Sequence, residues 1–175
     1  MISLTGFADA FRLTCGLEGD GKISTDPNDR GNWTGGQVGA GKLVGSRFGI
    51  SAAAFPGVDI PSLTYGQAQA LAKQHYWDPY QCDQFSPVVG WLVFDTAYNG
   101  GHPVQWLQEA AGVPQDGIIG AQTIAAVRNK GVARIVLRFM ASREDYWTGL
   151  AAWPSEGRGW IHRGTEMMRT ISDCL

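Results

Sequence analysis

The sequence predicts an α+β fold that is mostly α-helical, with a small β or loop insert after the first helix. Apolar residues recur at helical spacing near the N-terminus and again through most of the second half. Between these parts, residues 19–50 are rich in Gly, Asp, Asn and Thr and show no helical period, which is typical of turns and short strands. A helical body that carries one irregular insert belongs to the α+β class.

The first predicted helix spans residues 3–18 and is amphipathic, and a glycine directly after it supplies the stop. In the insert, the segment LVGSRFGIS, residues 43–51, is the best candidate for a strand. Thr64 and Gln67 then have the spacing of a capping box, which predicts a helix that runs to about Tyr76.

The second half of the chain contains the remaining predicted helices. Ser86 followed by Pro87 is a typical N-cap signal, and the apolar helix that it opens ends at Gly100. A short helix opens at His102-Pro103, and further helices are predicted over about residues 121–129, 132–149 and 158–172.

The composition excludes several classes of protein. The chain has 175 residues, of which 44% are hydrophobic, too many for a disordered chain. The net charge of −2 predicts no broad basic face for nucleic acid. Three cysteines that lie far apart form no disulfide framework, and no Cys or His cluster has the spacing of a zinc site. We therefore expect no metal, no cofactor and no nucleic-acid partner.

The N-terminal segment lacks the basic region of a signal peptide, and Asp9 and Arg12 interrupt its apolar residues. The sequence has no apolar run of the length that a transmembrane helix needs. We therefore expect a protein that is made in the cytoplasm without a signal peptide and does not insert into membranes. We also expect it to be a monomer.

Glycine is nearly twice as frequent as usual, and ten of the 24 glycines fall within residues 16–49. The segment from Gly36 to Gly41-Lys42 is close to a phosphate-binding loop, but Leu43 stands where that loop needs Ser or Thr. A pliant loop that lines a substrate is the better explanation of these glycines.

Glu18 stands out among the polar residues. It is the only glutamate before Glu109, and helical spacing places it between Phe7 and Phe11 in the apolar stripe of the first helix. It also precedes the glycine stop, at the negative end of the helix dipole. Partial burial and the dipole both disfavour the ionised carboxylate and raise its pKa, as a general acid requires. The alternative is a frayed helix end that leaves Glu18 in solvent.

Asp26, Asp29 and Thr34 lie in a short polar loop that follows Glu18. In glycoside hydrolysis one acid protonates the leaving oxygen, and a second carboxylate, here with a hydroxyl, holds and polarises a water. The alternative for both aspartates is turn formation, in which Asp is common. Trp33 lies in the same loop, and we expect it to contact the substrate. Most of the other tryptophans occupy apolar helical positions, where we expect core packing.

Five short segments in the first half match one family pattern: Glu18-Gly19, Asp26-Pro27, Asp29-Arg30-Gly31, Trp33-Thr34-Gly35-Gly36 and Phe48-Gly49-Ile50-Ser51. They resemble glycoside hydrolase family 108, the N-acetylmuramidases of phage endolysins and secretion activators. The resemblance implies a lysozyme-like fold, with Glu18 as the general acid and Asp29 and Thr34 completing a Glu-Asp-Thr set. Asp29 is favoured over Asp26 because its five-residue spacing to Thr34 is that of the family.

Four segments of the second half match a different pattern: FDTAYNGG (94–101), QWLQ (105–108), DGIIGAQT (116–123) and GRGWIHR (157–163). They resemble the family's usual companion, a helical peptidoglycan-binding module. The resemblance implies a lysozyme-like catalytic lobe over residues 1–86 and a helical peptidoglycan-binding lobe over residues 87–175. The Asp-Gly-x-x-Gly-x-x-Thr element itself is a turn that caps the next helix, so it indicates fold rather than ligand.

Asp95 and Asn99 lie one helical turn apart on the otherwise apolar helix 88–99. A buried polar pair that holds two lobes together explains them best. The alternative is that Asn99 reaches the sugar cleft, so Asn99 joins Trp33 and Asp26 as a candidate substrate-binding residue.

Together with the resemblance, these residues predict a peptidoglycan muramidase that hydrolyses the β-1,4 bond between N-acetylmuramic acid and N-acetylglucosamine. The implied partner is bacterial peptidoglycan. The implied delivery is that of a bacteriophage endolysin, made in the host cytoplasm and released to the cell wall by a holin. Two alternatives stay open here: a non-catalytic peptidoglycan-binding or secretion-associated protein, and an enzyme on another aminosugar polymer such as chitin.

Overall fold

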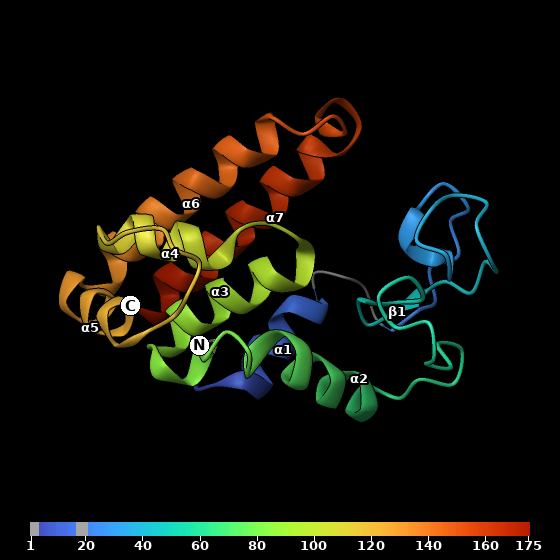
Figure 1. Ribbon diagram of the computed structural model, residues 1–175, viewed down its shortest axis with the longest axis horizontal. Coiled ribbons are helices and arrows are strands. Elements are labelled where there is room, and N and C mark those ends of the chain that lie inside the picture. Colours follow the sequence, from blue (N-terminus) through green and yellow to red (C-terminus); the bar gives the residue numbers. More distant parts are fainter. Residues whose placement is uncertain (1–3, 17–20) are drawn as a thin grey trace. The chain divides into compact units, whose positions relative to one another are not determined.

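The computed structural model describes residues 4–16 and 21–175. In these residues the protein has seven α-helices and one two-stranded antiparallel sheet (Figure 1). The chain forms two compact units: a helical unit, made of the residues up to Ala10 and Tyr76–Leu175, and a loop unit, Phe11–His75. The predicted α+β class with predominating helices is confirmed.

The helical unit is built around α3, Pro87–Asn99. This helix is buried from Val88 to Thr96, as its nearly continuous apolar sequence predicts. Helices α4 and α6 pack on α3, while α5 packs on α4 and α6, and α7 packs on α6 (Figure 1). The bounds of these helices are α4 Pro103–Ala111, α5 Ala121–Lys130, α6 Val132–Thr148 and α7 Trp153–Cys174.

Local sequence signals set the start of several helices. Ser86 Oγ accepts a hydrogen bond from the Val89 amide at 3.5 Å, and Pro87 occupies the first turn of α3, as predicted. Helix α7 begins at Trp153, earlier than the predicted start at residue 158. The proline that follows Trp153 suits the first turn of a helix, which explains the earlier start.

Helix α1 spans Phe7–Gly16, and it begins later than the predicted start at residue 3. The Asp9 carboxylate accepts hydrogen bonds from the Thr5 amide at 2.9 Å and from the Thr5 hydroxyl at 2.8 Å. These bonds satisfy donors ahead of the first turn, so the segment around Thr5 caps the helix instead of continuing it.

The sheet of the loop unit is a short hairpin. Strand β1, Ser46–Arg47, pairs antiparallel with β2, Ile50–Ser51. Phe48 and Gly49 between them have φ angles of 53° and 79°. Two successive left-handed residues reverse the chain as in a type I′ turn. The single strand predicted over residues 43–51 is therefore wrong, because the chain folds back in the middle of that segment.

Helix α2, Tyr65–Ala72, follows the hairpin and begins with the predicted capping box, which is confirmed. Thr64 Oγ1 accepts a hydrogen bond from the Gln67 amide at 3.3 Å, and Gln67 Oε1 accepts one from the Thr64 amide at 2.9 Å. A π-helical segment, Lys73–Trp77, continues the chain to the end of the predicted helix.

The tryptophans divide into two groups by burial. Core packing is confirmed for the majority, Trp77, Trp91, Trp106 and Trp147. The other three, Trp33, Trp153 and Trp160, are only half-buried.

Candidate active site

Glu18, the predicted general acid, lies outside the described residues, and its role stays a prediction. Helix α1 is the element that leads toward it. The described part of this helix buries Phe11, Thr14 and Cys15. The polar loop that follows Glu18 in the sequence contains the other predicted catalytic residues, Asp29 and Thr34.

Asp26 and Asp29 both form turns in this loop. Asp26 Oδ1 accepts hydrogen bonds from the backbone amide of Asn28 at 2.9 Å and from its side chain at 3.1 Å. Asp29 Oδ1 accepts one from the Gly31 amide at 2.8 Å and caps a 3₁₀ turn, Arg30–Asn32. The turn contacts considered as the alternative to a functional role are thus present.

These turns leave part of each carboxylate available. Both side chains are exposed, and each uses only its Oδ1 in the contacts given above. Within the described residues, Oδ2 of Asp26 and Oδ2 of Asp29 have no hydrogen-bond partner. A carboxylate that is fixed through one oxygen and open at the other is suited to hold a water or a sugar hydroxyl.

Thr34 ends the outgoing side of the loop, where it pairs with Lys42 on the returning side. Its Oγ1 accepts a hydrogen bond from the Lys42 amide at 2.9 Å, and its amide donates to the Lys42 carbonyl at 3.0 Å. Gly41 makes this close approach possible, because a Cβ there would lie 2.3 Å from Thr34 Oγ1. Its φ of +78° is also a conformation that glycine adopts at low cost.

Trp33, beside Thr34, is fixed in the same loop. Its indole N–H donates to the Pro27 carbonyl at 2.8 Å, which holds the ring at the turn that carries Asp26. The backbone of Trp33 forms an isolated bridge with Leu43. The structure therefore brings four predicted site residues, Asp26, Asp29, Trp33 and Thr34, into one ordered loop, while their roles stay predictions.

Asn32 at the centre of this loop was not predicted from the sequence. Its side chain is fully buried, and its Nδ2 donates to the Asp26 carbonyl at 3.0 Å. The main-chain carbonyl of Asn32 accepts hydrogen bonds from the amides of Val44 and Gly45 at 2.9 and 3.0 Å. Asn32 thus ties the turn of Asp26 to the opposite side of the loop. Its sequence position gives no signal of this burial, since asparagine is common in exposed loops.

The glycine-rich part of the loop does not form a phosphate-binding loop. Gly36, Gly39 and Gly41 have φ angles of 71°, 80° and 78°, and the Gly35 amide donates to the Ala40 carbonyl at 3.1 Å. A phosphate-binding loop leads into a helix. Here the chain instead returns alongside the Asp26–Thr34 segment, through the contacts of Lys42 and Leu43 already described.

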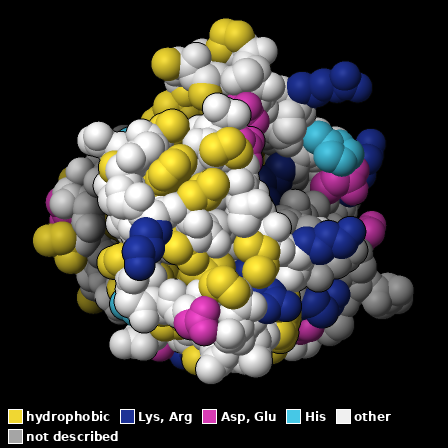
Figure 2. Space-filling model, turned by 90° about the vertical axis from the view of Figure 1, so that its right-hand side faces the viewer, with side chains coloured by type: hydrophobic (Ala, Val, Ile, Leu, Met, Phe, Trp, Pro, Cys, Tyr) yellow, Lys and Arg dark blue, Asp and Glu magenta, His cyan; other side chains and the backbone are white. Residues whose placement is uncertain are grey.

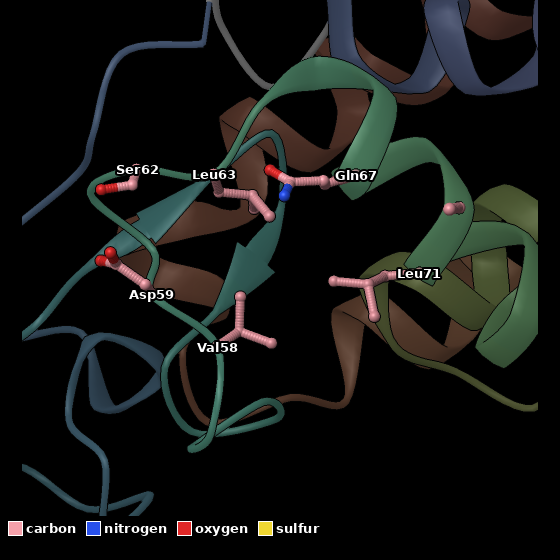
Figure 3. Close-up of a pocket in the computed structure, with 7 residues that line it drawn as sticks. Val58, Asp59, Ser62, Leu63, Gln67 and Leu71 are labelled. Carbon is pink, nitrogen blue, oxygen red and sulfur yellow. The ribbon is translucent and has the colours of Figure 1, made fainter.

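A pocket of about 450 Å³ opens in the loop unit between residues 58–63 and α2. Figure 3 shows the aliphatic side chains of Val58, Leu63 and Leu71 turned toward it from both sides. The amide of Gln67 also lines it, but its oxygen is already used in the capping box. Among the described residues, none of the predicted site residues lines this pocket.

Hydrophobic side chains are also exposed on the loop unit, among them Ile23, Val38 and Leu43. On the face drawn in Figure 2, hydrophobic side chains are interspersed with uncharged, basic and acidic ones. Such a surface offers a ligand both apolar contacts and hydrogen bonds.

In the helical unit, Asp95 is the centre of a buried ion cluster. Its side chain is fully buried and pairs with Arg143 at 2.8 Å and with Arg163 at 2.6 Å. Burial acts to raise the pKa of Asp95, but the charges and hydrogen bonds of the two arginines outweigh it and lower the pKa. Burial lowers the pKa of Arg143, although Asp95 opposes this effect.

These contacts explain the polar pair on α3. Asn99 Nδ2 donates to the Asp95 carbonyl at 2.8 Å and to its Oδ1 at 3.3 Å. The described ionic partners of Asp95 come from α6 and α7 of the helical unit, so here the pair joins three helices of one unit. Arg143 and Arg163 were not predicted as its partners. Asn99 and the polar loop belong to different units, and a role of Asn99 in substrate binding stays a prediction.

The Asp-Gly-x-x-Gly-x-x-Thr element is organised by a buried side chain, Gln108. The amide nitrogen of Gln108 donates to Asp116 at 2.6 Å and to the Ile118 carbonyl at 3.0 Å, and its oxygen accepts from the Gly117 amide at 3.0 Å. Hydrogen bonds from the Ile118 amide and from Gln108 lower the pKa of Asp116. These contacts leave the element as a structural turn ahead of α5.

Across the described ranges, no group of three or more His, Cys, Asp or Glu side chains is arranged to hold a metal ion. No helix in these ranges is both long and apolar enough to cross a membrane.

Comparisons with known proteins extend this picture. A family model described as glycosyl hydrolase 108 matches residues 12–101, and one described as a predicted peptidoglycan domain matches residues 102–165. The chain is similar to the structure of Brucella abortus SagA, with a TM-score of 0.77 and 28% sequence identity over 95% of this chain and 94% of that chain. Among curated proteins, no match was found.

The two family matches meet between residues 101 and 102, whereas the chain passes from one compact unit to the other between residues 10 and 11 and again between residues 75 and 76. The division predicted at residue 86, between a catalytic and a binding lobe, stays a prediction. The predicted lysozyme-like fold is confirmed by the structural match. The chain is thus a glycoside hydrolase that acts on peptidoglycan, and because the first family model matches more than half of its length, it belongs to glycosyl hydrolase family 108.

Proposed function

We propose that this peptidoglycan hydrolase is a muramidase, which cleaves the β-1,4 bond between N-acetylmuramic acid and N-acetylglucosamine. Glu18 donates a proton to the glycosidic oxygen, so that the leaving sugar departs as an alcohol. Asp29, assisted by Thr34, holds the water that adds to the anomeric carbon and takes up its proton.

The observation that carries this proposal is the ordered polar loop. Asp29 is fixed through Oδ1 and open at Oδ2, which suits a group that must hold a water in one position. The Thr34 oxygen accepts from the Lys42 amide, so its own O–H is left to donate to a water or a sugar. Trp33, with its N–H bound to Pro27, supplies a positioned ring for a sugar face.

Asp26 is the competing second carboxylate, since it is exposed and open at Oδ2 in the same way. The family spacing to Thr34 favours Asp29. In this scheme Asp26 contacts the substrate without activating the water, so its replacement should weaken binding more than it slows the chemical step.

Turbidity loss of permeabilised Gram-negative cells tests these roles. Glu18→Gln should reduce the lysis rate by about 10²- to 10⁴-fold, the usual contribution of a general acid. Asp29→Asn should cause a similar loss, while Asp26→Asn should mainly raise the substrate concentration that is needed. Asp83→Asn, at another exposed aspartate, is the control and should lyse at the wild-type rate. A Glu18→Gln protein that lyses as fast as wild type contradicts the proposal.

The bond specificity needs its own measurement, because chitin also consists of β-1,4-linked aminosugars. Mass spectrometry of digested peptidoglycan should find N-acetylmuramic acid at each new reducing end. N-acetylglucosamine at the new reducing ends would identify a glucosaminidase instead. Faster cleavage of chitin oligomers than of peptidoglycan strands would favour the chitin alternative.

We also propose that the protein is delivered as an endolysin, which collects in the host cytoplasm until a holin opens the membrane. This rests on the family resemblance. Expression in a bacterial host should leave cells intact until a holin is co-expressed, and rapid lysis should then follow. Lysis at the same rate without a holin contradicts this route.

A further inference from the structure

Three tryptophans lie in successive ring contacts at the end of the α6–α7 hairpin, and we call them the tryptophan column: Trp147, Trp160 and Trp153. The ring centroids of Trp147 and Trp160 lie 6.5 Å apart with an interplanar angle of 30°, and those of Trp160 and Trp153 lie 6.4 Å apart at 42°. Trp147 comes from the end of α6 and the other two from the start of α7, where these helices run side by side (Figure 1).

The inner end of the column is fixed by the buried ion cluster. Trp147 is only 5% exposed, and the Arg143 guanidinium lies 4.9 Å from its ring centroid, while the same arginine is paired with Asp95. Gly164 of α7 lets the ring of Trp147 approach closely, since a Cβ there would lie 3.1 Å from it. These contacts therefore fix the position of the Trp147 ring.

The outer end differs from ordinary core packing. Trp153 and Trp160 are half-buried, and in the described part of the chain their indole N–H groups have no hydrogen-bond partner. The core residue Trp77 also has an unpaired Nε1, but its ring is buried, whereas half-buried indoles can offer this donor to a bound molecule. The rings and N–H donors of Trp153 and Trp160 are therefore within reach of a molecule at the surface.

The outermost ring is also held in place. A Cβ at Gly157 would lie 2.6 Å from Cε3 of Trp153, so this indole rests directly on the backbone of α7. Only glycine at position 157 allows this contact. Because Trp153 is immobilised before any ligand arrives, binding to its face costs little conformational entropy.

We propose that Trp153 and Trp160 form a glycan-binding subsite that holds the aminosugar backbone of peptidoglycan away from the bond that is cleaved. The apolar C–H groups of sugar rings pack against the exposed parts of the two indoles, and the N–H groups donate to hydroxyl or acetamido oxygens. The inference rests on peptidoglycan as the substrate. It does not depend on which bond is cut or on which residue is the acid.

A glycan fits this surface better than a lipid or a second protein copy. The first turns of α7 also expose Glu156, which lies one helical turn before Trp160 on the same side of the helix. An exposed carboxylate on the side of the helix that carries the two aromatic rings offers hydrogen bonds to a hydroxyl-rich ligand. The predicted peptidoglycan domain spans the whole column, since it matches residues 102–165.

Co-sedimentation of the full chain with purified Gram-negative sacculi tests the inference. Trp153→Ala and Trp160→Ala should each weaken binding roughly three- to tenfold, which is the contribution of one aromatic contact. The double variant should weaken it by more than tenfold. Leu137→Ala removes a side chain that is 68% exposed on α6 and should bind like wild type.

Two further variants separate binding from folding. Gly157→Ala keeps both indoles and favours a helix, but it displaces Trp153, so its affinity for sacculi should also fall. Trp153→Phe with Trp160→Phe keeps aromatic packing and should bind with intermediate affinity. Wild-type binding by the double alanine variant, or by Gly157→Ala, overturns the inference. So does wild-type binding by the phenylalanine variant when the alanine variants are unfolded.

The same variants test the other occupants and the proposed function. Light scattering tests a second copy of the chain as the occupant, and vesicle binding tests a membrane. If the alanine variants lose a dimer, or lose vesicle binding, while they still bind sacculi like wild type, the column belongs to that occupant instead. Glu18→Gln should still bind sacculi. A Glu18→Gln protein that lyses cells would contradict the proposed acid, but the comparison of column variants would remain valid.

Discussion

In the helical unit the central carboxylate, Asp95, is fully buried and paired with two arginines. In the loop unit the carboxylates of Asp26 and Asp29 are exposed and bound by neighbouring amides. The first arrangement is held by side chains that come from three helices. The second is held by the backbone of a single loop, in which Gly41 allows the close approach of Thr34.

This difference predicts where each unit is sensitive to mutation. A buried ion cluster loses much stability when one side chain is removed, because the remaining charges are left unpaired in an apolar environment. A loop that is shaped by left-handed glycines is sensitive instead to an added Cβ atom. Substitutions in the two units should therefore affect different properties, global stability in one and activity in the other.

The largest loss of stability is expected from Asp95→Asn. The variant leaves Arg143 and Arg163 without their counter-charge, which should lower the free energy of unfolding by about 3–5 kcal/mol. Glu166→Gln is the matched control, because its partner Arg169 is 70% exposed in the same helix, and it should cost less than about 1 kcal/mol. Chemical denaturation followed by circular dichroism measures both. Equal stabilities for the two variants would show that the buried cluster contributes no more to the free energy of unfolding than an exposed ion pair does.

Acid should weaken the same cluster. The pKa of Asp95 is lowered in the folded protein, so its stabilising contribution is complete above the unfolded-state value of about 3.9. It is lost as the pH falls below that value toward the folded-state pKa. The melting temperature should therefore drop below about pH 4, and Asp95→Asn should show a smaller drop than wild type. A wild-type and an Asp95→Asn protein with parallel acid profiles would contradict this assignment.

Local signals explain why much of the fold could be predicted. Ser86-Pro87 and the Thr64–Gln67 pair act through contacts within one helical turn, so the sequence alone contains them. The hairpin could not be predicted in this way. Phe48 adopts a φ of 53°, a conformation that a bulky side chain rarely takes, and its sequence gives no warning of the turn.

The candidate sites show the same limit. The turns of Asp26 and Asp29 could be predicted because an aspartate bonds to an amide two residues ahead. The partners of Asp95 could not, since Arg143 and Arg163 lie far along the chain on helices where arginine usually faces solvent. Asn32 was missed for a similar reason, because its burial depends on how the whole loop closes.

Two glycines of the polar loop give a matched pair of variants. Gly39 and Gly41 have φ angles of +80° and +78°, so alanine at either position costs roughly 1–2 kcal/mol of backbone strain. Only at Gly41 would the new Cβ also collide with Thr34 Oγ1, whereas at Gly39 nothing lies within 4 Å. Gly41→Ala should therefore reduce the lysis rate by a further 10- to 100-fold, the usual cost of a displaced active-site group.

Steady-state lysis rates at saturating protein, with melting temperatures measured in parallel, compare the two glycine variants. Equal losses of activity in Gly39→Ala and Gly41→Ala would mean that strain alone matters and that the position of Thr34 does not. Thr34→Ala should reproduce the loss in Gly41→Ala without its strain.

The smallest effect is expected from a side chain in the loop unit. Thr64→Ala removes the cap of α2, in which Thr64 Oγ1 accepts from the Gln67 amide, and it should cost about 1 kcal/mol, while Thr64→Ser keeps the oxygen and restores most of this. Hydrogen exchange at the Gln67 amide should be faster in the alanine variant only. A loss for Thr64→Ala as large as that for Asp95→Asn would remove the distinction between the units, because single side chains would then stabilise the loop unit as strongly as they stabilise the helical one.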